Sequence, residues 1–544
     1  MFFKRVDGKC RITFKAIMRN TVLGCSLIIS IGYMSGCTRI PGTSTTPPNI
    51  IEEQPRWAAY RDMARAFAEE MITHGTDRYG WATSPQFATM LMRTYPPTLP
   101  PDPVFLTDPK PGQSRSMVEN LPNIYKGANR AHKITYRGGD VADDAGLYQL
   151  LYAMGKEPGG ERYKAAADAS IQWFLANTPM HNGLLPWGEH TGWDFRREHF
   201  DYGYPYDKKH EFAGSWPLWE RFFALQPHGG EGSTTVMERY ARGVWKGAIG
   251  YQDGKLVYCR HASLVDFERP TYGEWALYGM FPRHGGNYLE LWSIALVRSH
   301  NTEFREWMAP RIGQFLSALA GQIAAHGYPI YHFRGDENIF NGPQVASMAV
   351  DLVEASHRLQ RDYPTLALEA LRLAGLSQET LITRRANLRA EELYRLWQLN
   401  EGSPNTAKRA AYFRTQLIAL ADSLAALPVL PERPIKEKVV GQTQSGRIPE
   451  QYAKTIDALL LAAQSKAGRG AAFYLEHASR FAQEAMGMFI DGDSPLPKSL
   501  DRVPMLLDGT PFPAFYHSYL GGDDLMWSFW RLAKALEKVK GGRP

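Results

Sequence analysis

Alternation of long and short connections between helical segments is the feature that most constrains the fold of this 544-residue chain. Apolar residues recur at helical spacing in one stretch after another, from residue 56 to near the C-terminus. Consecutive antiparallel helices place alternate connections at opposite ends, so all of the long loops are expected on one face. The long loops are residues 75–139, 178–210, 250–286, 326–342, 427–448 and 490–522.

This pattern predicts an all-α fold, an (α/α)6 toroid, complete or incomplete, in which inner helices ring a core and outer helices enclose them. We expect residues 56–544 to form one domain, with residues 365–400 as an insertion on the short-loop face. Strand signals are scarce, at residues 255–258 and 328–333. A helical solenoid is the alternative, but the sequence has no fixed-period repeat. The expected helices are residues 56–73, 140–154, 161–177, 211–225, 234–249, 287–299, 303–325, 343–359, 406–426, 449–464, 471–488 and 523–538.

The N-terminus has the pattern of an export signal. Basic residues precede an apolar run at residues 21–33, which is too short to span a membrane and suits a signal-peptide core. The run ends at Met34-Ser35-Gly36-Cys37, which resembles a bacterial lipobox. We therefore expect a lipoprotein signal peptide at residues 1–37, lipidation of Cys37 and a polar tether at residues 38–55. The protein is then exported and anchored by lipid to the bacterial cell envelope, on its periplasmic or outer side.

Charge and cysteine content exclude several classes of function. The formal charge of +6 is small, and the chain lacks a dense Lys/Arg stripe, which argues against nucleic acid as a partner. Cys259 is the one cysteine after Cys37, so the sequence excludes an internal disulfide and a cysteine-based metal site. Aromatic residues make up 12% of the chain, and many lie in the expected loops, as they do in carbohydrate sites.

The stretch at residues 181–195, HNGLLPWGEHTGWDF, combines aromatic rings with ionisable groups. A pyranose has an apolar face that stacks on an aromatic ring and a rim of hydroxyl groups that form hydrogen bonds. The stretch is therefore a candidate wall of a sugar site, and the alternative is a Trp-rich turn of the core. Its candidate residues are Trp187, Trp193, Glu189, His190 and Asp194.

Further candidates lie in the other long loops and at the starts of the expected inner helices. Helix N-termini favour anions through their free N–H groups and dipole, so a ring of them suits carboxylated sugars. Arg283 beside His284 at a helix entrance indicates an anion site, because a cation next to an imidazole is unfavourable unless they share an anion. The remaining candidates are His210, Glu211, Tyr202, Tyr206, Asn287, Tyr288 and Asp140.

Three of the motifs also have purely structural interpretations. The glycine pair at 285–286 could serve only the close packing of helices. The acidic pair at 523–524 could lie in the first turn of the last helix and oppose its dipole. His74-Gly75 could be a helix C-cap with its glycine in the left-handed conformation.

The sequence leaves metal binding open. It has neither His-x3-His nor His-Glu-x-x-His on a helix, so a metal site would be assembled from separate loops. The candidate calcium ligands are Asp77, Asp336 and the turn at residues 491–493, although that turn lacks the rest of an EF-hand loop. We therefore expect no certain cofactor, with Ca2+ as the candidate ion.

Several motifs give the chain a resemblance to known proteins. They are HGTDRYG at residues 74–80 with SPQF at 84–87, GLLPWGEH at 183–190 and FPRHGG at 281–286. Together they resemble secreted bacterial proteins described as pectate-lyase-like and, more loosely, the helical-toroid polysaccharide lyases. The resemblance spans residue 56 to the C-terminus and implies a substrate that contains uronate. The Asn-His helix motif of the alginate and chondroitin lyases is absent, so no catalytic role is carried over residue by residue.

We therefore predict a carbohydrate-active enzyme that degrades a uronate-containing, anionic polysaccharide or oligosaccharide by β-elimination. This reaction removes the C5 proton of a uronate and expels the C4 oxygen, so it needs a carboxylate neutraliser, a base and an acid. Arg283 is the expected neutraliser, with His284 or His190 beside it. The expected base is His210 or His190. The expected acid is Tyr202, Tyr206 or Tyr288.

Two alternatives remain open at this point. A glycoside hydrolase on the same toroid would need two carboxylates beside the glycosidic bond. Glu189, Asp194, Glu211 and Asp140 are available for that role. A non-catalytic, glycan-binding surface lipoprotein is the second alternative, and the many His residues beside carboxylates argue against it.

Overall fold

The structure is a computed structural model, and it describes most of the chain after residue 55. The described residues belong to one unit that begins at Gln54. The expected signal peptide, tether and lipidation site at Cys37 lie outside them. The described residues are 56–109, 111, 118–122, 137–178, 182–186, 192–201, 209–211, 218–227, 234–252, 255–259, 261–263, 276–277, 285–329, 340–434, 445–492 and 494–541.

Fourteen α-helices make up most of the described residues, which confirms the all-α prediction. The helix expected at residues 161–177 has the same bounds in the structure. The helices are α1 (Arg56–His74), α3 (Ala145–Met154), α4 (Glu161–Asn177), α5 (Trp219–Leu225), α6 (Val236–Ala248), α7 (Gly285–Arg298), α8 (Thr302–His326), α9 (Gly342–Leu359), α10 (Pro364–Thr383), α11 (Ala390–Asn400), α12 (Ala407–Ala425), α13 (Pro449–Gln464), α14 (Ala471–Phe489) and α15 (Gly522–Gly541).

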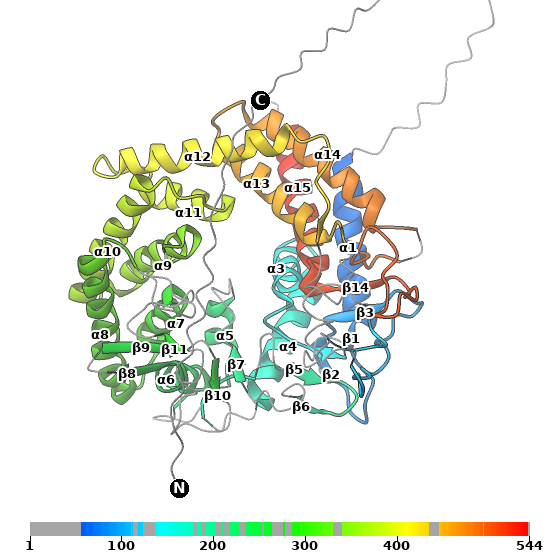
Figure 1. Cartoon of the computed structure of the whole chain (residues 1–544), viewed down its shortest axis with the longest axis horizontal. Helices are drawn as coiled ribbons and strands as arrows, with labels where there is room; N and C mark the ends of the chain where they lie inside the picture. The colour runs from blue at the N-terminus through cyan, green and yellow to red at the C-terminus, as the bar shows by residue number, and fades with distance from the viewer. Residues whose placement is uncertain are drawn as a thin grey trace, which may run out of the picture. The chain divides into compact units, whose positions relative to one another are not determined.

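The helices are arranged as an inner and an outer ring (Figure 1). α3, α7, α9, α11, α13 and α15 lie inside, whereas α1, α8, α10, α12 and α14 lie outside. Neighbouring inner helices pack on one another, as α7 does on α9, α11 on α13 and α13 on α15. The last helix, α15, closes the ring against α1 and α3. The toroid prediction is therefore confirmed.

Residues 365–400, which we expected to be an insertion, form helices of the ring itself. α10 packs on α8 and α9, and α11 packs on α9, α12 and α13, so both continue the inner–outer series. The described part of the chain thus has fourteen helices, two more than the twelve expected from the sequence. The sequence pattern misled us because the connection at residues 384–389 is short although it lies on the long-loop face.

Short strands join loops that are far apart in the sequence. β3 (Met90–Met92), in the first long loop, pairs with β14 (Phe515–His517), in the last. β4 (Gly138–Gly139) pairs with β5 (Gly192–Asp194), and β7 (Lys209–Glu211) pairs with β10 (His261–Ser263). Paired strands lie side by side, so four of the six long loops meet on one face. The other strands are β1 (Thr76–Asp77), β2 (Ser84–Phe87), β6 (His199–Asp201), β8 (Ile249–Gln252), β9 (Lys255–Cys259), β11 (Ala276–Leu277), β12 (Arg433–Pro434) and β13 (Ser445–Gly446).

Two strand predictions can be compared with this list. The strand expected at residues 255–258 is confirmed as β9, which forms a hairpin with β8. Most of the strand expected at residues 328–333 lies outside the described residues. Two helix predictions are wrong at their start, because α3 begins at Ala145 and not at residue 140, and because residues 209–211 form β7 and α5 begins only at Trp219. Pairing with β10 outweighs the local helical pattern there.

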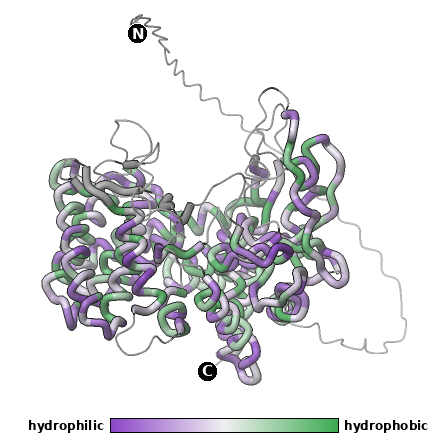
Figure 2. Tube along the Cα trace, turned by 90° about the horizontal axis from the view of Figure 1, so that it is seen from below, coloured by the Kyte–Doolittle hydropathy of each residue, from purple (hydrophilic) through white to green (hydrophobic). Residues whose placement is uncertain are grey.

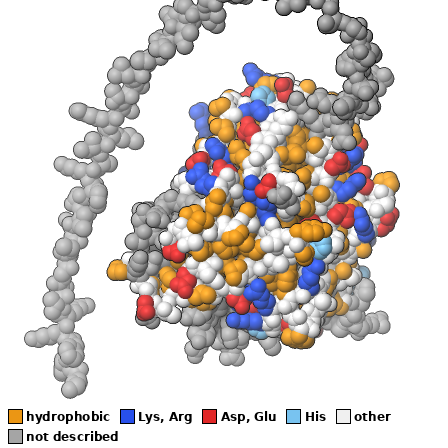
Figure 3. Space-filling model, turned by 90° about the vertical axis from the view of Figure 1, so that its right-hand side faces the viewer, with side chains coloured by type: hydrophobic (Ala, Val, Ile, Leu, Met, Phe, Trp, Pro, Cys, Tyr) orange, Lys and Arg blue, Asp and Glu red, His pale blue; other side chains and the backbone are white. Residues whose placement is uncertain are grey.

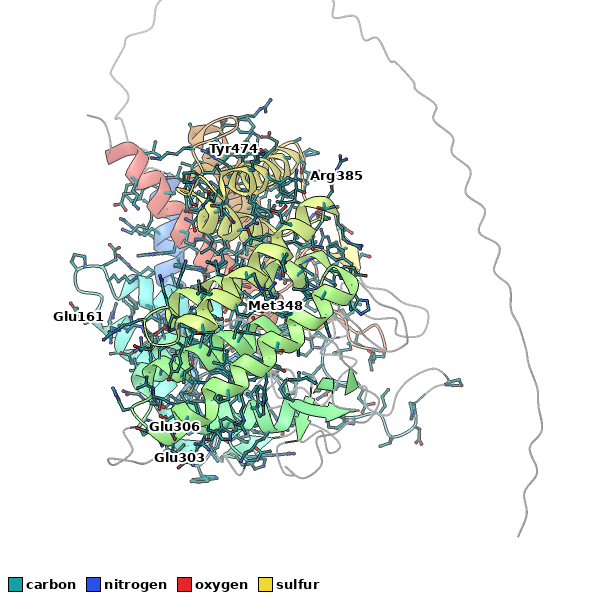
Figure 4. The ribbon with its side chains drawn as sticks, turned by 90° about the vertical axis from the view of Figure 1, so that its left-hand side faces the viewer. Glu161, Glu303, Glu306, Met348, Arg385 and Tyr474 are labelled. Atoms are coloured by element: carbon teal, nitrogen blue, oxygen red, sulfur yellow. The ribbon has the colours of Figure 1, made fainter. Side chains whose placement is uncertain are left out.

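The two faces of the toroid can be told apart in Figure 4. Glu161 and Glu303, near the starts of α4 and α8, lie on the side of the short connections. Arg385, which follows α10, lies on the opposite side, where strands β8 and β9 are also found. The inner helices therefore begin on the long-loop face, as the sequence pattern predicts.

Local signals determine where several helices begin and end. Thr235 and Glu238 form a capping box at the start of α6, with each side chain accepting the other residue's backbone N–H. Asn301 caps the start of α8, and Gly327 caps its end in the left-handed conformation, with φ of 79°. Gly75, by contrast, is not among the glycines with positive φ, so the expected left-handed cap of α1 is wrong.

The core lies between the inner and outer helices, where each helix buries its apolar side. Hydrophobic and hydrophilic residues alternate along the helices in Figure 2, as amphipathic packing requires. One large cluster of buried apolar residues includes side chains from α1, α3, α7, α13 and α15. In the described part of the chain, no helix has the length and apolar character needed to cross a membrane.

Candidate functional site

The structure describes the side chains of five candidate residues. They are Asp140, Trp193, Asp194, Asn287 and Tyr288. For His210 and Glu211 it describes the backbone. The other candidates lie outside the described residues and stay predictions. They are Trp187, Glu189, His190, Tyr202, Tyr206, Arg283 and His284.

A three-stranded sheet places the end of the first long loop beside the candidate stretch. β4 pairs with β5, so that Gly138 lies opposite Asp194 and Gly139 opposite Trp193. β5 in turn pairs with β6. Asp140 follows β4 directly, and its carboxylate accepts the N–H of Ala142 at 2.9 Å in a turn that leads into α3. The sheet thus brings three of the candidate residues together.

Trp193 is half-buried and packed by other aromatic rings. Its ring centroid lies 4.9 Å from that of Trp173 and 5.2 Å from that of Phe200, both at steep angles. Its indole N–H donates a hydrogen bond to Asp77 Oδ2 at 3.2 Å. These contacts give Trp193 a packing role, so a role in sugar stacking stays a prediction for Trp193 as it does for Trp187.

Asp194 is fully buried and holds the β5–β6 turn. Its Oδ1 accepts the backbone N–H groups of Arg196, at 3.0 Å, and Arg197, at 3.1 Å. Its other oxygen pairs with Arg137, at the start of β4. A carboxylate with these partners positions the wall of the site and is poorly placed to contact a sugar directly.

The β7–β10 pair joins the second and third long loops. His210 lies opposite Ala262, and Glu211 lies opposite His261. His261 was not among the candidates, although its loop was. An imidazole and a carboxylate are residue types that serve as acid and base or as metal ligands. The register therefore adds His261 to the candidate site, a relation that only strand pairing between distant loops could reveal.

Asn287 and Tyr288 lie in the first turn of α7. The Tyr288 side chain is buried, and its ring centroid lies 5.6 Å from that of Trp292. Asn287 is also buried. In this arrangement Tyr288 contributes to the core, and its expected contact with substrate stays a prediction.

Gly286, the second residue of α7, packs directly on Asp351 of α9. A Cβ at this position would overlap the Asp351 carboxylate, so no larger residue fits without movement. The close-packing interpretation of the glycine pair therefore applies to Gly286. Arg283 and His284, just before it, lie outside the described residues.

A charged network links α7, α9 and α11 beneath this helix start. Arg358 lies 3.3 Å from the carboxylates of both Glu290 and Glu354, and Arg395 pairs with Glu354. Burial, followed by the charge of Glu290, raises the pKa of Asp351 well above its usual value. We did not predict this network, although residues 351, 354 and 358 share one face of a helix by their spacing.

A second group of buried carboxyls joins the starts of α3 and α15. Asp523 Oδ2 accepts the N–H of Leu147 at 3.0 Å, so a residue of α15 caps α3, while Asp144 at the N-cap position makes no such bond. Burial is the largest cause of the raised pKa of both Asp144 and Asp523. Burial likewise raises the pKa of Asp524, to about 7. The acidic pair thus does more than oppose the dipole of its own helix.

Within the described ranges, no group of three or more His, Cys, Asp or Glu side chains is arranged to hold a metal ion. Asp77, a candidate calcium ligand, accepts the Ser84 hydroxyl at 2.8 Å and the Trp193 indole N–H. Burial raises the pKa of Asp77 to about 6. Asp491 pairs with Arg93. Asp336 and Asp493 lie outside the described residues, so calcium binding stays a proposal.

Comparison with known proteins supports a carbohydrate-active enzyme as the class. Residues 135–275 match a protein family described as periplasmic pectate lyase. This match confirms the pectate-lyase-like resemblance over the second and third long loops, including GLLPWGEH, whereas HGTDRYG and FPRHGG lie outside it. No curated protein matches the chain.

Two solved structures that align with this chain are sugar epimerases. Cellobiose 2-epimerase from Spirochaeta thermophila is 12% identical, with a TM-score of 0.38, and the alignment covers 90% of this chain and 100% of that one. A sugar epimerase from a ruminal bacterium is 10% identical, with a TM-score of 0.35, and the alignment covers 77% of this chain and 92% of that one. Because both TM-scores are low, the fold is described from the arrangement of this chain's own helices and not from these structures.

Proposed function

We propose that this protein is a polysaccharide lyase that cleaves a uronate polymer of the polygalacturonate type by β-elimination. The observation that carries the proposal is the family match at residues 135–275. The match covers most of two long loops that strands β7 and β10 join. These loops carry most of the residues to which we assign the chemistry, and Arg283 and His284 follow shortly after the matched range.

The proposed roles follow from the needs of β-elimination. Arg283 neutralises the uronate carboxylate, which makes the C5 proton more acidic. His210 or His190 removes that proton, and a tyrosine such as Tyr202 protonates the leaving oxygen. Glu211 and His261, which lie opposite each other in β7 and β10, complete the polar groups of the site.

The reaction class is tested by its product. A lyase leaves a C4–C5 double bond, which absorbs ultraviolet light, whereas a hydrolase leaves new reducing ends without that absorbance. We expect the absorbance to rise during incubation with polygalacturonate. Reducing ends that form without absorbance would instead establish the hydrolase. Asp194 and Asp140 both hold turns, so such a hydrolase would depend on Glu189 and Glu211.

Arg283→Ala is expected to lower kcat/KM for polygalacturonate by roughly 10²–10³-fold, because the variant leaves the uronate charge unneutralised in the transition state. The matched control is Arg361→Ala, since Arg361 is almost fully exposed on the short-loop face. Initial rates of absorbance change measure both variants. An Arg283→Ala enzyme as active as the control would remove Arg283 from the mechanism.

Chelation followed by return of Ca2+ in the same assay tests the proposed ion, and a rate that chelation leaves unchanged would exclude it.

We also propose export and lipid anchoring through Cys37, on the pattern of residues 1–37. The description of the matched family as periplasmic supports export. Cys37→Ser is expected to move most of the protein from the membrane fraction to the soluble fraction, because the anchoring lipid is lost. The measurement is an immunoblot of fractionated cells. Retention of the variant in the membrane fraction would exclude a lipid anchor at Cys37.

A further inference from the structure

Two aromatic side chains of the first long loop are almost fully exposed. Trp81 is 83% exposed and Tyr95 is 86% exposed. The other large hydrophobic residues exposed in the described part of the chain are aliphatic. A free indole ring offers an apolar surface on which the face of a pyranose can stack. Figure 3 shows the side of the molecule that carries α1, where hydrophobic side chains lie exposed among charged ones.

Hydrogen bonds to the buried carboxylates of Glu198 and Asp77 hold the loop that carries Trp81. The N–H of Ala82 donates to Glu198 Oε1 at 3.1 Å, and Glu198 belongs to the β5–β6 turn. Ser84 Oγ donates to Asp77 Oδ2 within the β1–β2 pair. Trp81 is therefore an exposed ring on a fixed loop, and a ligand that binds to it pays little for ordering that loop.

This contact also places Trp81 beside the candidate site. Glu198 belongs to the hairpin of β5 and β6, and β5 pairs with β4 at the end of the first long loop. The loop that carries Trp81 thus contacts the β5–β6 turn of the sheet that carries Trp193 and Asp194.

Two arginines, Arg78 and Arg197, belong to the loop of Trp81 and to the turn that this loop contacts, and arginine binds the carboxylate of a uronate. Arg78 is exposed three residues before Trp81. Arg197 precedes Glu198, and its side chain is 60% exposed, with its Nε 3.9 Å from Asp194 Oδ2. A guanidinium group recognises a carboxylate through two parallel hydrogen bonds. An aromatic plate with arginines beside it suits an apolar sugar face that carries a carboxylate.

We infer that Trp81 forms an outer subsite that stacks one uronate residue of a bound polymer, with Arg78 beside its carboxylate. The inference deepens the proposed function and rests on it for the identity of the sugar. We assign Tyr95 to the same subsite. The Tyr79 hydroxyl, two residues before Trp81, donates a hydrogen bond of 3.3 Å to the carbonyl of Pro97, two residues after Tyr95, and so joins the two parts of the loop.

The test is affinity electrophoresis in gels that contain polygalacturonate. Trp81→Ala is expected to weaken retention roughly three- to tenfold, the effect of losing one aromatic contact. The control is Leu368→Ala, which removes a side chain that is 69% exposed on outer helix α10. We expect this control to migrate like the unmodified protein. If Trp81→Ala also migrates like the unmodified protein, the subsite does not exist.

Two further comparisons separate this inference from the proposed function. The loss of binding caused by Trp81→Ala is expected to be smaller for trigalacturonate than for the polymer, because a short oligosaccharide that occupies the central site leaves an outer subsite empty. An equal loss would place Trp81 in the central site and overturn the inference. Unmodified protein that binds the polymer without forming an ultraviolet-absorbing product would reject the lyase, while the gel would still decide the subsite.

The role of Arg78 is tested with the charge of the ligand. Arg78→Gln should weaken retention in polygalacturonate and leave retention in fully methyl-esterified pectin unchanged, because only the first polymer carries carboxylates. Equal retention of Arg78→Gln and the unmodified protein in both gels would remove the guanidinium from the subsite.

Discussion

Replacement of Gly138 by alanine is expected to destabilise the protein by roughly 3 kcal/mol, the upper end of the usual cost of overpacking. A Cβ on Gly138 would overlap the carbonyl oxygen of Trp193 in the paired strand. The Gly138 carbonyl also accepts the backbone N–H of Thr89, at 3.1 Å. Gly138 therefore has backbone on two sides, and the strain cannot be relieved by the rotation of one side chain.

Gly321→Ala is the matched control for this prediction. Gly321 lies inside α8, and outside the local backbone of that helix no atom lies within 4 Å of the position that its Cβ would take. This variant should be stabilised by roughly 0.5–1 kcal/mol, because alanine favours the helix. Urea denaturation of both variants measures the difference. Equal stability of Gly138→Ala and the unmodified protein would show that β4 and β5 are not paired as described, and the arrangement of the site wall would have to be revised.

Asp523→Asn is expected to stabilise the protein at pH 7 by roughly 1–3 kcal/mol, because asparagine can be buried at this pH without taking up a proton. Burial and the charges of Asp524 and Asp144 raise the pKa of Asp523 well above its usual value. The folded protein thus retains a proton that the unfolded chain releases above about pH 4. The stability of the unmodified protein therefore falls as the pH rises from there towards neutrality.

Asparagine does not ionise, so the advantage of Asp523→Asn should be small at pH 4 and should grow up to pH 7. Its side-chain oxygen can still accept the N–H of Leu147, the bond by which α15 caps α3. Asp523→Ala loses that acceptor and should be about 1 kcal/mol less stable than the asparagine variant. Thermal unfolding across this pH range measures all three proteins. An advantage of Asp523→Asn that does not change with pH would contradict the buried, protonated carboxyl.

The helices were predictable because their signal is local. Residues 161–177 carry an amphipathic pattern between clear ends, and the helix there has the predicted bounds. The start of α5 was not predictable in the same way, because residues 209–211 pair with a strand about 50 residues further along the chain. α10 and α11 were misjudged because a short connection on the long-loop face hides their place in the series.

The candidate site was predictable as a set of loops but not as a set of contacts. Trp193 and Asp194 were predicted to lie in one wall of the site, and their partners Asp77 and Arg137 come from another loop. Those partners give both residues a structural role that residue type alone does not reveal. The pairing of Glu211 with His261 was likewise invisible before β7 and β10 were placed side by side.

The sequence alone determined the all-α class, the single face for the long loops and the resemblance to pectate-lyase-like proteins. Each of these depends on periodicity, loop length or motifs that are read within short stretches of chain. Only the tertiary structure decided that residues 365–400 belong to the ring and that α15 caps α3. It also decided that a side chain at Gly138 or Gly286 would meet atoms of distant segments. Contacts between distant segments depend on how the whole chain packs, and no local pattern encodes them.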